Sequence, residues 1–284
     1  MVNISFYPVV TMTLFLALSV DALAPPSNVV VFGGTGYVGS RVCERLIDQG
    51  YDVTAVSRRG TNPRPTDAAL EQVTWVKGDA TNVRDVEKFV MQSDAVVHAV
   101  GLLFDVESGL VGLNNIVSGS KSVPDPEAST YDNITRQTMF NIINSIEKKA
   151  KNPLNMMKKE KTPLAFVSCA EAGWPDVPFG DVVDNIAPAW LKSYLKAKRA
   201  VEGRLGSSSA IRPVVMRPSL IWSWDKLDVL PIIPVFNLAS AIGIPFVDKT
   251  VRVECLADAI VEGIKDNSVT GVQRYMDMEK LAAR

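Results

Sequence analysis

Residues 29–42 read VVVFGGTGYVGSRV, and this stretch decides the fold class of the chain. A run of β-branched and aromatic residues predicts a buried strand over 28–32, which the glycines end abruptly. The pattern then becomes helical over 37–48, with apolar residues recurring along one side. A strand, a glycine-rich turn and a helix in this order begin a βαβ unit, the unit from which parallel sheets are built.

The alternation of short apolar runs and helical stretches continues to about residue 222. Five further strands are predicted over 52–57, 73–77, 94–99, 163–168 and 213–217, with helices over 83–91, 131–150 and 187–205. Residues 104–130 show no sustained period and predict a long loop, of the length typical of lids and binding loops. The predicted fold class is α/β, with a Rossmann-type doubly wound parallel sheet and a small C-terminal lobe.

The turn GGTGYVG has the spacing of a dinucleotide-binding loop. Glycines in the pattern GxGxxG permit a tight turn and let backbone N–H groups approach a pyrophosphate, while the helix N-terminus adds a partial positive charge. A tight turn without a ligand is the alternative, but the flanking strand and helix favour nucleotide binding. The predicted contacts in the turn are Gly33, Gly34, Thr35, Gly36, Tyr37, Val38 and Gly39.

The end of the second predicted strand indicates which dinucleotide binds. An NAD site is expected to carry an acidic residue there, to bind the ribose 2′-hydroxyl. The chain instead has Ser57, Arg58 and Arg59, and an arginine fork can bind a 2′-phosphate. We therefore predict NADP(H) rather than NAD(H), with a solvated basic turn as the alternative. Asp79 and Ala80, after the third strand, are placed to meet the adenine.

A third motif lies in the predicted helix over 187–205, where Tyr194 and Lys198 are four residues apart. Residues at this spacing share a helix face and can point at one site. A free tyrosine is a poor base at neutral pH, and a neighbouring ammonium lowers its pKa. The pair then exchanges a proton with a substrate hydroxyl or carbonyl. The spacing alone is common, so its value depends on the motifs around it.

Composition excludes several other functions. The 284 residues carry a formal net charge of −1, which gives no reason to expect nucleic acid as a partner. Cys43, Cys169 and Cys255 lack disulfide or zinc spacing and are interpreted as small buried hydrophobes. The single histidine, His98, lies in an apolar strand and cannot complete a metal site. We assign no metal.

The two ends of the chain have their own character. Residues 1–24 include an apolar run over 9–20, too short to span a bilayer but typical of a signal peptide, while the core over 25–222 is the predicted nucleotide-binding domain. Residues 223–284, rich in Pro and large apolar groups in their first half, form the predicted C-terminal substrate lobe. The apolar residues of that half either pack as core, which we favour, or line a pocket for a quinone or lipid: Leu230, Ile232, Ile233, Val235, Phe236, Ile242, Ile244 and Phe246.

The signal-like segment also bears on location. The first basic residue is Arg41, so the basic start of a signal peptide is missing and a mitochondrial presequence is disfavoured. ALAP, at 22–25, resembles the bipartite plastid presequences of algae with secondary plastids, with Leu23 where an aromatic residue usually stands. A plastid is the predicted location; the alternatives are the mitochondrion, the secretory pathway, and a buried N-terminal helix that targets nothing.

Together, GGTGYVG, the helix with Tyr194 and Lys198, and Arg217-Pro218 after the sixth strand resemble the short-chain dehydrogenase/reductase superfamily. The resemblance is to its extended and atypical branches, the NAD-dependent epimerase/dehydratase-like and NmrA-like proteins. VVHAVGLLF, STYDNITRQTMFNII and YLKAKRAVE are similar to a narrower group. That group includes the Rossmann-like accessory subunit of respiratory complex I, coenzyme-Q-associated mitochondrial relatives, and plastid proteins of plants.

This resemblance implies roles for individual residues. Tyr194 would be the catalytic acid/base, and Lys198 would bind the nicotinamide ribose and tune the tyrosine. Further cofactor contacts would come from His98, Ala99, Val100, Gly101, Pro218 and Ser219. The family's third catalytic member is a Ser or Thr after the fifth strand, where this chain reads FVSCAEAGW. Aligning on the strand end puts Ala170 at that position, with Ser168 two residues early.

Two functions follow from the resemblance. The first is an NADP(H)-dependent oxidoreductase acting on a small carbonyl or hydroxyl compound, with Ser168 as the third candidate catalytic residue beside Tyr194 and Lys198. The second is a non-catalytic cofactor-binding protein that assists a membrane complex or a quinone or pigment pathway. The Tyr-Lys pair favours the first and Ala170 favours the second. A small-molecule substrate and peripheral membrane association are the expected partners, and the oligomeric state is open.

Overall fold

The computed structural model describes residues 27–104, 108, 128–153, 160–225 and 233–284. Within these ranges, seven parallel strands form one sheet in the order β3-β2-β1-β4-β5-β6-β9. The predicted signal segment over 1–24 and most of the predicted loop over 104–130 lie outside the described residues. The first six strands follow the order expected of a doubly wound dinucleotide-binding sheet, so the predicted fold class is confirmed.

The strands of the sheet are β1 (Asn28–Phe32), β2 (Asp52–Ser57), β3 (Thr74–Lys77), β4 (Ala95–His98), β5 (Thr162–Val167), β6 (Ile211–Met216) and β9 (Gly271–Gln273). The longer helices are α1 (Tyr37–Asp48), α3 (Val83–Val90), α5 (Thr138–Ala150), α8 (Ala189–Gly206), α10 (Val253–Lys265) and α11 (Tyr275–Ala282). Shorter elements are α2 (Ala68–Glu71), η3 (Asp132–Gln137), η4 (Ala170–Asp176), α7 (Gly180–Ile186), α9 (Ile233–Ala241), and the strand pair β7 (Ile221–Trp222) and β8 (Val251–Arg252).

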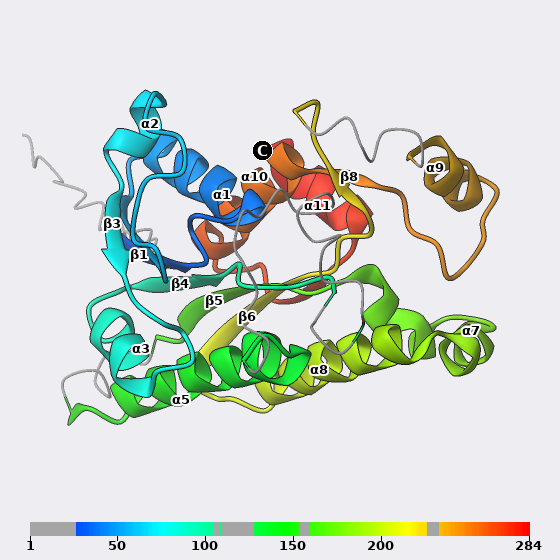
Figure 1. The fold of residues 1–284 in the computed structure, drawn as a ribbon, viewed down its shortest axis with the longest axis horizontal. Coiled ribbons are helices and arrows are strands. Elements are labelled where there is room, and N and C mark those ends of the chain that lie inside the picture. Colours follow the sequence, from blue (N-terminus) through cyan, green and yellow to red (C-terminus); the bar gives the residue numbers. More distant parts are fainter. Residues whose placement is uncertain (1–26, 105–107, 109–127, 154–159, 226–232) are drawn as a thin grey trace, which may run out of the picture.

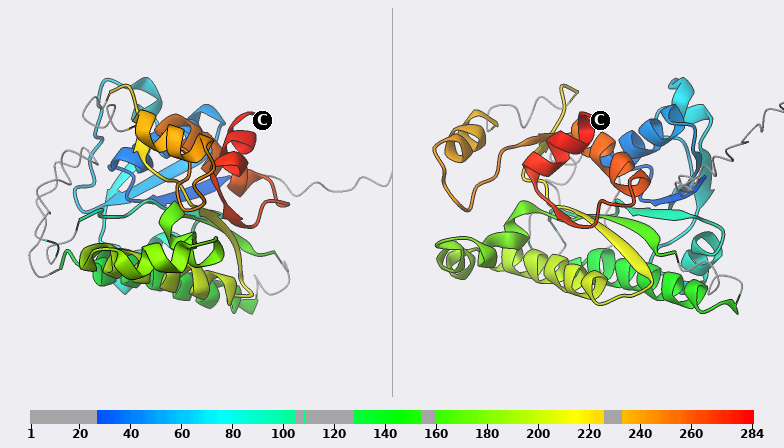
Figure 2. Two further views of the ribbon diagram at one scale, coloured as in Figure 1. Left: turned by 90° about the vertical axis from the view of Figure 1, so that its right-hand side faces the viewer. Right: turned by 180° about the vertical axis from the view of Figure 1, so that it is seen from behind.

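Helices cover both faces of the sheet. In Figure 1, α1, α10 and α11 lie on one face and α3, α5 and α8 on the other, and the two further views in Figure 2 keep the same three layers. The residues of β1 explain why, because successive side chains of a strand point to opposite faces. Val29 and Val31 pack in the core on the α1 and α10 side, whereas Val30 and Phe32 pack against α3 and α5. A strand buried on both faces requires this unbroken apolar run.

Most predicted elements have the observed bounds to within two residues, and the ranges 28–32, 37–48 and 52–57 coincide with β1, α1 and β2. The predicted helix over 131–150 divides into the π-helix η3 followed by α5. A π-helix inserts a wider turn, which leaves no mark on apolar periodicity, and it occurs often at functional sites.

The stretch over 223–284 differs most from its prediction as a lobe. α9 lies at one end of the molecule (Figure 1), whereas β9 pairs with β6 and α10 packs against α1. The cause is an apolar face on α10, where Leu256, Ile260 and Ile264 are fully buried. Their four-residue spacing places these side chains along one face of the helix. That face becomes buried when the helix packs in the layer that covers the sheet. α10 and β9 therefore complete the main α/β unit.

Candidate functional site

The glycine turn between β1 and α1 is shaped by close backbone contacts. Gly33 has a φ of 85°, and a Cβ added there would lie 2.8 Å from the carbonyl carbon of Ala99. A Cβ added to Gly39 would lie 2.2 Å from the Gly33 carbonyl oxygen. The helix can begin this close to the turn only because both positions lack a side chain. The backbone required for the predicted loop is therefore present.

The N-terminus of α1 is the place where this turn could hold an anion. The helix begins after Gly36 without a hydrogen bond from a capping side chain, and its first closing bond runs from the Ser40 N–H to the Gly36 carbonyl. N–H groups of an uncapped first turn, with the helix dipole behind them, bind phosphate. The turn and the helix together fit the pyrophosphate of a dinucleotide.

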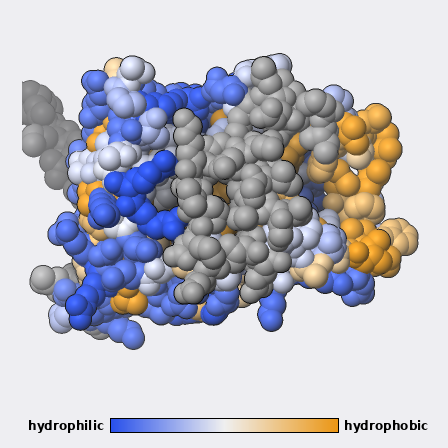
Figure 3. All heavy atoms as spheres, viewed as in Figure 1, coloured by the Kyte–Doolittle hydropathy of each residue, from blue (hydrophilic) through white to orange (hydrophobic). Residues whose placement is uncertain are grey.

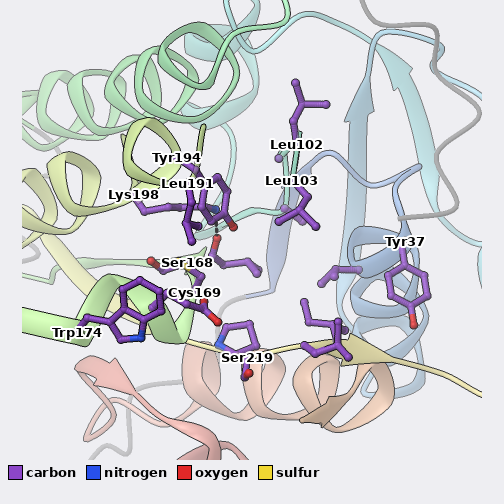
Figure 4. Close-up of a pocket in the computed structure, with 18 of the residues that line it drawn as sticks. Tyr37, Leu102, Leu103, Ser168, Cys169, Trp174, Leu191, Tyr194, Lys198 and Ser219 are labelled. Atoms are coloured by element: carbon purple, nitrogen blue, oxygen red, sulfur yellow. Dashed lines mark hydrogen bonds between the residues drawn. The ribbon is translucent and has the colours of Figure 1, made fainter. Parts of the chain in front are cut away.

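A cavity of about 610 Å³ opens beside the turn, at the carboxyl ends of the parallel strands. Ligands of open α/β sheets bind in this position, where the strand order reverses. Figure 4 shows Tyr194 and Lys198 on one side of the cavity, Ser168, Cys169 and Ser219 along the sheet, and Tyr37 across from them. Eleven predicted site residues line it: Gly36, Tyr37, Val38, Ala99, Val100, Gly101, Ser168, Tyr194, Lys198, Pro218 and Ser219. The other predicted residues do not: Gly33, Gly34, Thr35, Gly39, Ser57, Arg58, Arg59, Asp79, Ala80 and His98.

Tyr194 and Lys198 meet on the face of α8 that borders the cavity. The Lys198 Nζ lies 5.4 Å from the centre of the Tyr194 ring and donates a hydrogen bond of 2.7 Å to the Val167 carbonyl. Only 3% of Lys198 is exposed. Lys198 is thus held by the end of β5 with its ammonium group close to the Tyr194 ring. The four-residue spacing predicted that these two side chains lie together.

The electrostatics of this pair differ from the sequence-based expectation. Burial raises the pKa of Tyr194 well above its ordinary value, and the neighbouring Cys169 and Glu171 raise it further. Burial also lowers the pKa of Lys198 to about 8. Loss of hydration outweighs the effect of the ammonium on the phenol, so the expected lowering of the tyrosine pKa is wrong for this state of the protein. Tyr194 carries its proton at neutral pH.

The Ser168 hydroxyl makes a structural hydrogen bond. Its Oγ donates a hydrogen bond of 2.5 Å to the Glu202 Oε1, and Glu202 also accepts from the Arg217 Nε at 3.1 Å and the Nη2 at 2.6 Å. Glu202 and Arg217 expose only 11% and 13% of their side chains. The serine hydroxyl thus completes a buried ion pair that joins α8 to the end of β6.

The residue beside Tyr194 is Cys169, for which its sequence context predicts a small buried hydrophobe. Cys169 lines the cavity, and a hydrogen bond with its side chain is among the causes of the raised Tyr194 pKa. Burial raises the pKa of the Cys169 thiol to about 12, so it stays protonated. Ala170 begins η4, donates its N–H to the Pro218 carbonyl and does not line the cavity.

His98 belongs to the core rather than to the cavity wall. It is fully buried, and its Nε2 lies 2.8 Å from the Thr138 Oγ1. Since Thr138 already donates to the Ile134 carbonyl, the histidine is assigned as the donor and its Nδ1 carries no proton. Burial and the charge of Lys198 lower the pKa of His98 to about 3. Its neutral ring packs 5.6 Å from the ring of Phe166.

The predicted 2′-phosphate and adenine residues lie at the ends of β2 and β3, beyond the cavity. Arg58 and Arg59 are exposed, and neither makes a hydrogen bond or ion pair with any residue in the described ranges. Arg64, in the same connection, is already paired with Glu44 at 2.7 Å. Asp79 accepts two hydrogen bonds from Thr81. Two unpaired guanidinium groups at the end of β2 suit an anionic ligand.

Comparison with known proteins defines the class of the fold. The family model described as the NAD dependent epimerase/dehydratase family matches residues 29–114. The chain has the NAD(P)-binding epimerase/dehydratase-type fold. The ElxO structure with NADP bound aligns with a TM-score of 0.58 at 14% identity, over 88% of this chain and 96% of that one. The Bordetella bronchiseptica enzyme WbmH in complex with NAD+ aligns at 0.52 and 19% identity, over 88% and 75%.

Two relatives extend the similarity over most of the chain. MIOREX complex component 2 of Saccharomyces cerevisiae is 23% identical over 224 residues, which is 72% of this chain and 76% of that protein. The uncharacterized protein At1g32220, chloroplastic, of Arabidopsis thaliana is 26% identical over 277 residues, 90% of this chain and 78% of that protein. The resemblance stated from the motifs is thereby confirmed, and a nicotinamide dinucleotide is supported as the cofactor.

The described residues contain no helix long and apolar enough to cross a membrane, and no group of three His, Cys, Asp or Glu side chains that could hold a metal. The walls of the cavity are largely apolar, and Trp174, Trp190, Phe236 and Phe246 contribute to them. Phe236 and Phe246 come from the stretch that the sequence analysis favoured as core packing. Figure 3 shows apolar side chains gathered at the end of the molecule that α7 and α9 form.

Proposed function

We propose that the protein is an NADP(H)-dependent oxidoreductase that reduces a small, apolar carbonyl compound or oxidises the corresponding alcohol. The proposal rests chiefly on Tyr194, a protonated phenol in the cavity wall with Lys198 beside its ring. The glycine turn beside this cavity, within the stretch that matches the NAD dependent epimerase/dehydratase model, supports a nicotinamide dinucleotide site there. A bound nicotinamide would supply or accept the hydride at the substrate carbon.

The residues of the chain account for the rest of the chemistry. In the reductive direction Tyr194 donates its proton to the carbonyl oxygen, and the charge of Lys198 stabilises the phenolate that remains. Apolar walls exclude water and strengthen both interactions. Because the raised pKa keeps Tyr194 protonated at neutral pH, the resting phenol is in the form that reduction requires.

The preference for NADP(H) rests on Arg58. Its exposed guanidinium has no partner within the described residues, and it follows directly after β2, where the cofactor ribose of such folds lies. A bidentate pair with a 2′-phosphate would give that group a partner of matching geometry. Phe236, Phe246 and the tryptophans of the cavity favour an apolar substrate such as a quinone or lipid.

One experiment tests this function on the full chain. NADPH and NADH are titrated by fluorescence, and turnover of a panel of aliphatic and quinone carbonyls is compared between the wild type and Tyr194→Phe. We expect tighter binding of NADPH, and a loss of turnover of about 10²- to 10⁴-fold in the variant, because general acid catalysis contributes this much. Tight cofactor binding without Tyr194-dependent turnover would refute the enzymatic function.

That refuting outcome is what the second function predicts. A non-catalytic, cofactor-binding accessory protein is favoured by Ser168, whose hydroxyl is committed to Glu202 rather than to the cavity. The relationship to a protein named as a complex component supports association with a larger assembly. The chloroplastic relative supports an organelle as the location, and we propose the plastid. Fluorescence of the tagged full chain in cells tests that location.

A further inference from the structure

The cavity wall contains a carboxyl group that the proposed chemistry does not use. Glu171, in η4, lines the cavity with Cys169, Tyr194 and Lys198. Its carboxylate makes no ion pair with any residue that the structure describes. A glutamate in the wall of an apolar cavity without a paired cation is uncommon, because an unpaired charge is costly to bury.

The nearest cations are engaged elsewhere. Arg199 donates to the backbone carbonyl of Glu171 at 3.3 Å, but its guanidinium pairs with the Asp184 carboxylate at 2.9 and 3.0 Å. Lys198 directs its Nζ to the Val167 carbonyl. Two cationic side chains thus lie close to η4, and both are held by other acceptors. Neither cation neutralises a charge on Glu171, whose carboxylate has only hydrogen bonds, with Cys169 and its own backbone, to stabilise it.

The protonated form of Glu171 is favoured relative to that of an exposed glutamate. Burial raises its pKa and the charge of Asp248 acts in the same direction, whereas hydrogen bonds with its own backbone and with the Cys169 side chain lower it. The titratable groups that face Glu171 are Cys169, Tyr194 and Asp248, and Asp248 is itself paired with Arg274. A protonated carboxyl group carries one O–H donor, whereas the ionised form is an acceptor only. A protonated Glu171 therefore adds an O–H donor to the cavity wall, beside the Cys169 side chain with which it makes a hydrogen bond.

We propose that Glu171, in its protonated form, donates a hydrogen bond to the oxygen of the bound substrate and so orients that oxygen toward Tyr194. It would take the part that the serine or threonine hydroxyl plays in related enzymes, which Ser168 does not supply here. The proton stays on Glu171, and the proton transferred in reduction is that of Tyr194. This inference rests on the proposed function for its reaction, but its hydrogen bond is a property of the cavity alone.

The arrangement also selects the class of substrate. A neutral carbonyl or hydroxyl oxygen can accept from Glu171, and the apolar walls then bury the remainder of the molecule. A carboxylate substrate would need a cation in the cavity wall, and Lys198 already serves Tyr194 and Val167. The site is thus built for uncharged apolar compounds with one oxygen function.

Binding measured without cofactor tests the hydrogen bond separately from catalysis. Trp174 and Trp190 line the cavity, so quenching of tryptophan fluorescence reports occupancy. Cyclohexanone serves as the probe with an oxygen, and methylcyclohexane as the probe without one. The proteins are the full-length wild type, Glu171→Gln, Glu171→Ala and, as the matched control, Glu71→Gln on the exposed surface of α2.

We expect Glu171→Ala to weaken cyclohexanone binding about tenfold at a pH below the raised pKa of Glu171, the effect of one hydrogen bond, and to leave methylcyclohexane binding unchanged. Glu171→Gln retains a donor and should bind cyclohexanone as the wild type does. In the wild type, cyclohexanone affinity should fall as pH rises through the raised pKa of Glu171, and this fall should be absent in Glu171→Gln.

Three results would overturn the inference: equal cyclohexanone affinity in all four proteins, equal losses in the glutamine and alanine variants, or no cyclohexanone binding by the wild type. The outcome is independent of the turnover test. If Tyr194→Phe leaves turnover unchanged while the Glu171 pattern holds, the proposed function fails and the oxygen-binding site stands. If turnover depends on Tyr194 but not on Glu171, the proposed function stands and the role of Glu171 fails.

Discussion

The glycine turn after β1 and the segment after β5 border the same cavity, yet the sequence predicts them with different success. The turn is defined by its backbone, and Gly33 and Gly39 are needed because a Cβ at either position would lie 2.8 or 2.2 Å from another backbone atom. The segment after β5 is defined by which side chain points into the cavity. There Ser168, Cys169 and Glu171 all line the cavity, but the Ser168 hydroxyl donates its hydrogen bond to Glu202.

The difference shows what a motif can specify. A loop that binds phosphate through N–H groups needs a backbone path, and glycine spacing records that path directly. A catalytic hydroxyl needs one side chain at one position, and a shift of a single residue reverses the direction in which it points. Glycine motifs therefore predict structure more reliably than motifs that depend on one reactive side chain.

The largest effect is expected where the backbone is most crowded. Gly39→Ala would place a Cβ 2.2 Å from the Gly33 carbonyl oxygen, and neither α1 nor the turn can move without losing the anion site. Overpacking of this kind costs about 1–3 kcal/mol of folding stability, and NADPH binding should become undetectable in a fluorescence titration. Gly203→Ala, in α8 with open space around it, is the control and should raise the melting temperature slightly. Normal NADPH binding by Gly39→Ala would show that the turn is not the dinucleotide site.

Local patterns explain how much of the fold was predictable. β1, α1 and β2 are specified by apolar periods and a glycine turn within each segment, and their bounds were predicted without error. β9 has three residues, too few for a period, and it is held by its pairing with β6. The π-helix η3 and the place of α10 against α1 likewise depend on contacts distant in sequence.

The candidate site divides in the same way. Tyr194 and Lys198 share a face because helix geometry alone brings i and i+4 together. Which neighbour meets Tyr194 depends on how the chain leaves β5 and enters η4, and aligning the strand end put Ala170 there in place of Cys169. The directions of the pKa shifts also required the structure, because burial is the first cause of each for Tyr194 and Lys198.

A second large effect is expected at Lys198. The variant Lys198→Met removes the charge beside the Tyr194 ring, and carbonyl reduction should fall about 100-fold, within the range for acid–base assistance. The wild-type rate should decline as pH rises through about 8, since the folded-state pKa is lowered to that value and the ammonium is charged only below it. Lys196→Met, at an exposed position of the same helix, is the control and should keep this pH profile. A wild-type rate that stays constant from pH 7 to 10 would contradict the role of the charge.

A smaller effect separates the two candidates after β5. Cys169→Ser places a stronger donor beside Tyr194 and should raise turnover several-fold, since one neutral hydrogen bond contributes about 1 kcal/mol. Ser168→Ala should lower the free energy of unfolding by about 1–2 kcal/mol, because Glu202 loses a hydrogen bond, and should change turnover less than threefold. Steady-state kinetics and urea unfolding measure the two effects. Loss of turnover in Ser168→Ala at full stability would reverse the assignment.

The last effect, on cofactor binding alone, is expected at Arg58, where a single side chain again determines the outcome. Arg58→Gln removes one exposed guanidinium group, and the dissociation constant for NADPH should rise about tenfold while that for NADH stays the same, because only the 2′-phosphate distinguishes the two. Arg84→Gln, an exposed substitution on α3, controls for general charge and should change neither. If NADPH binding is unchanged in Arg58→Gln and lost in Arg59→Gln, the neighbouring arginine binds the phosphate. The glycine turn would then be assigned correctly, but the phosphate-binding arginine would be misassigned by one residue. After β5, Ala170 was likewise predicted at the position beside Tyr194 that Cys169 occupies.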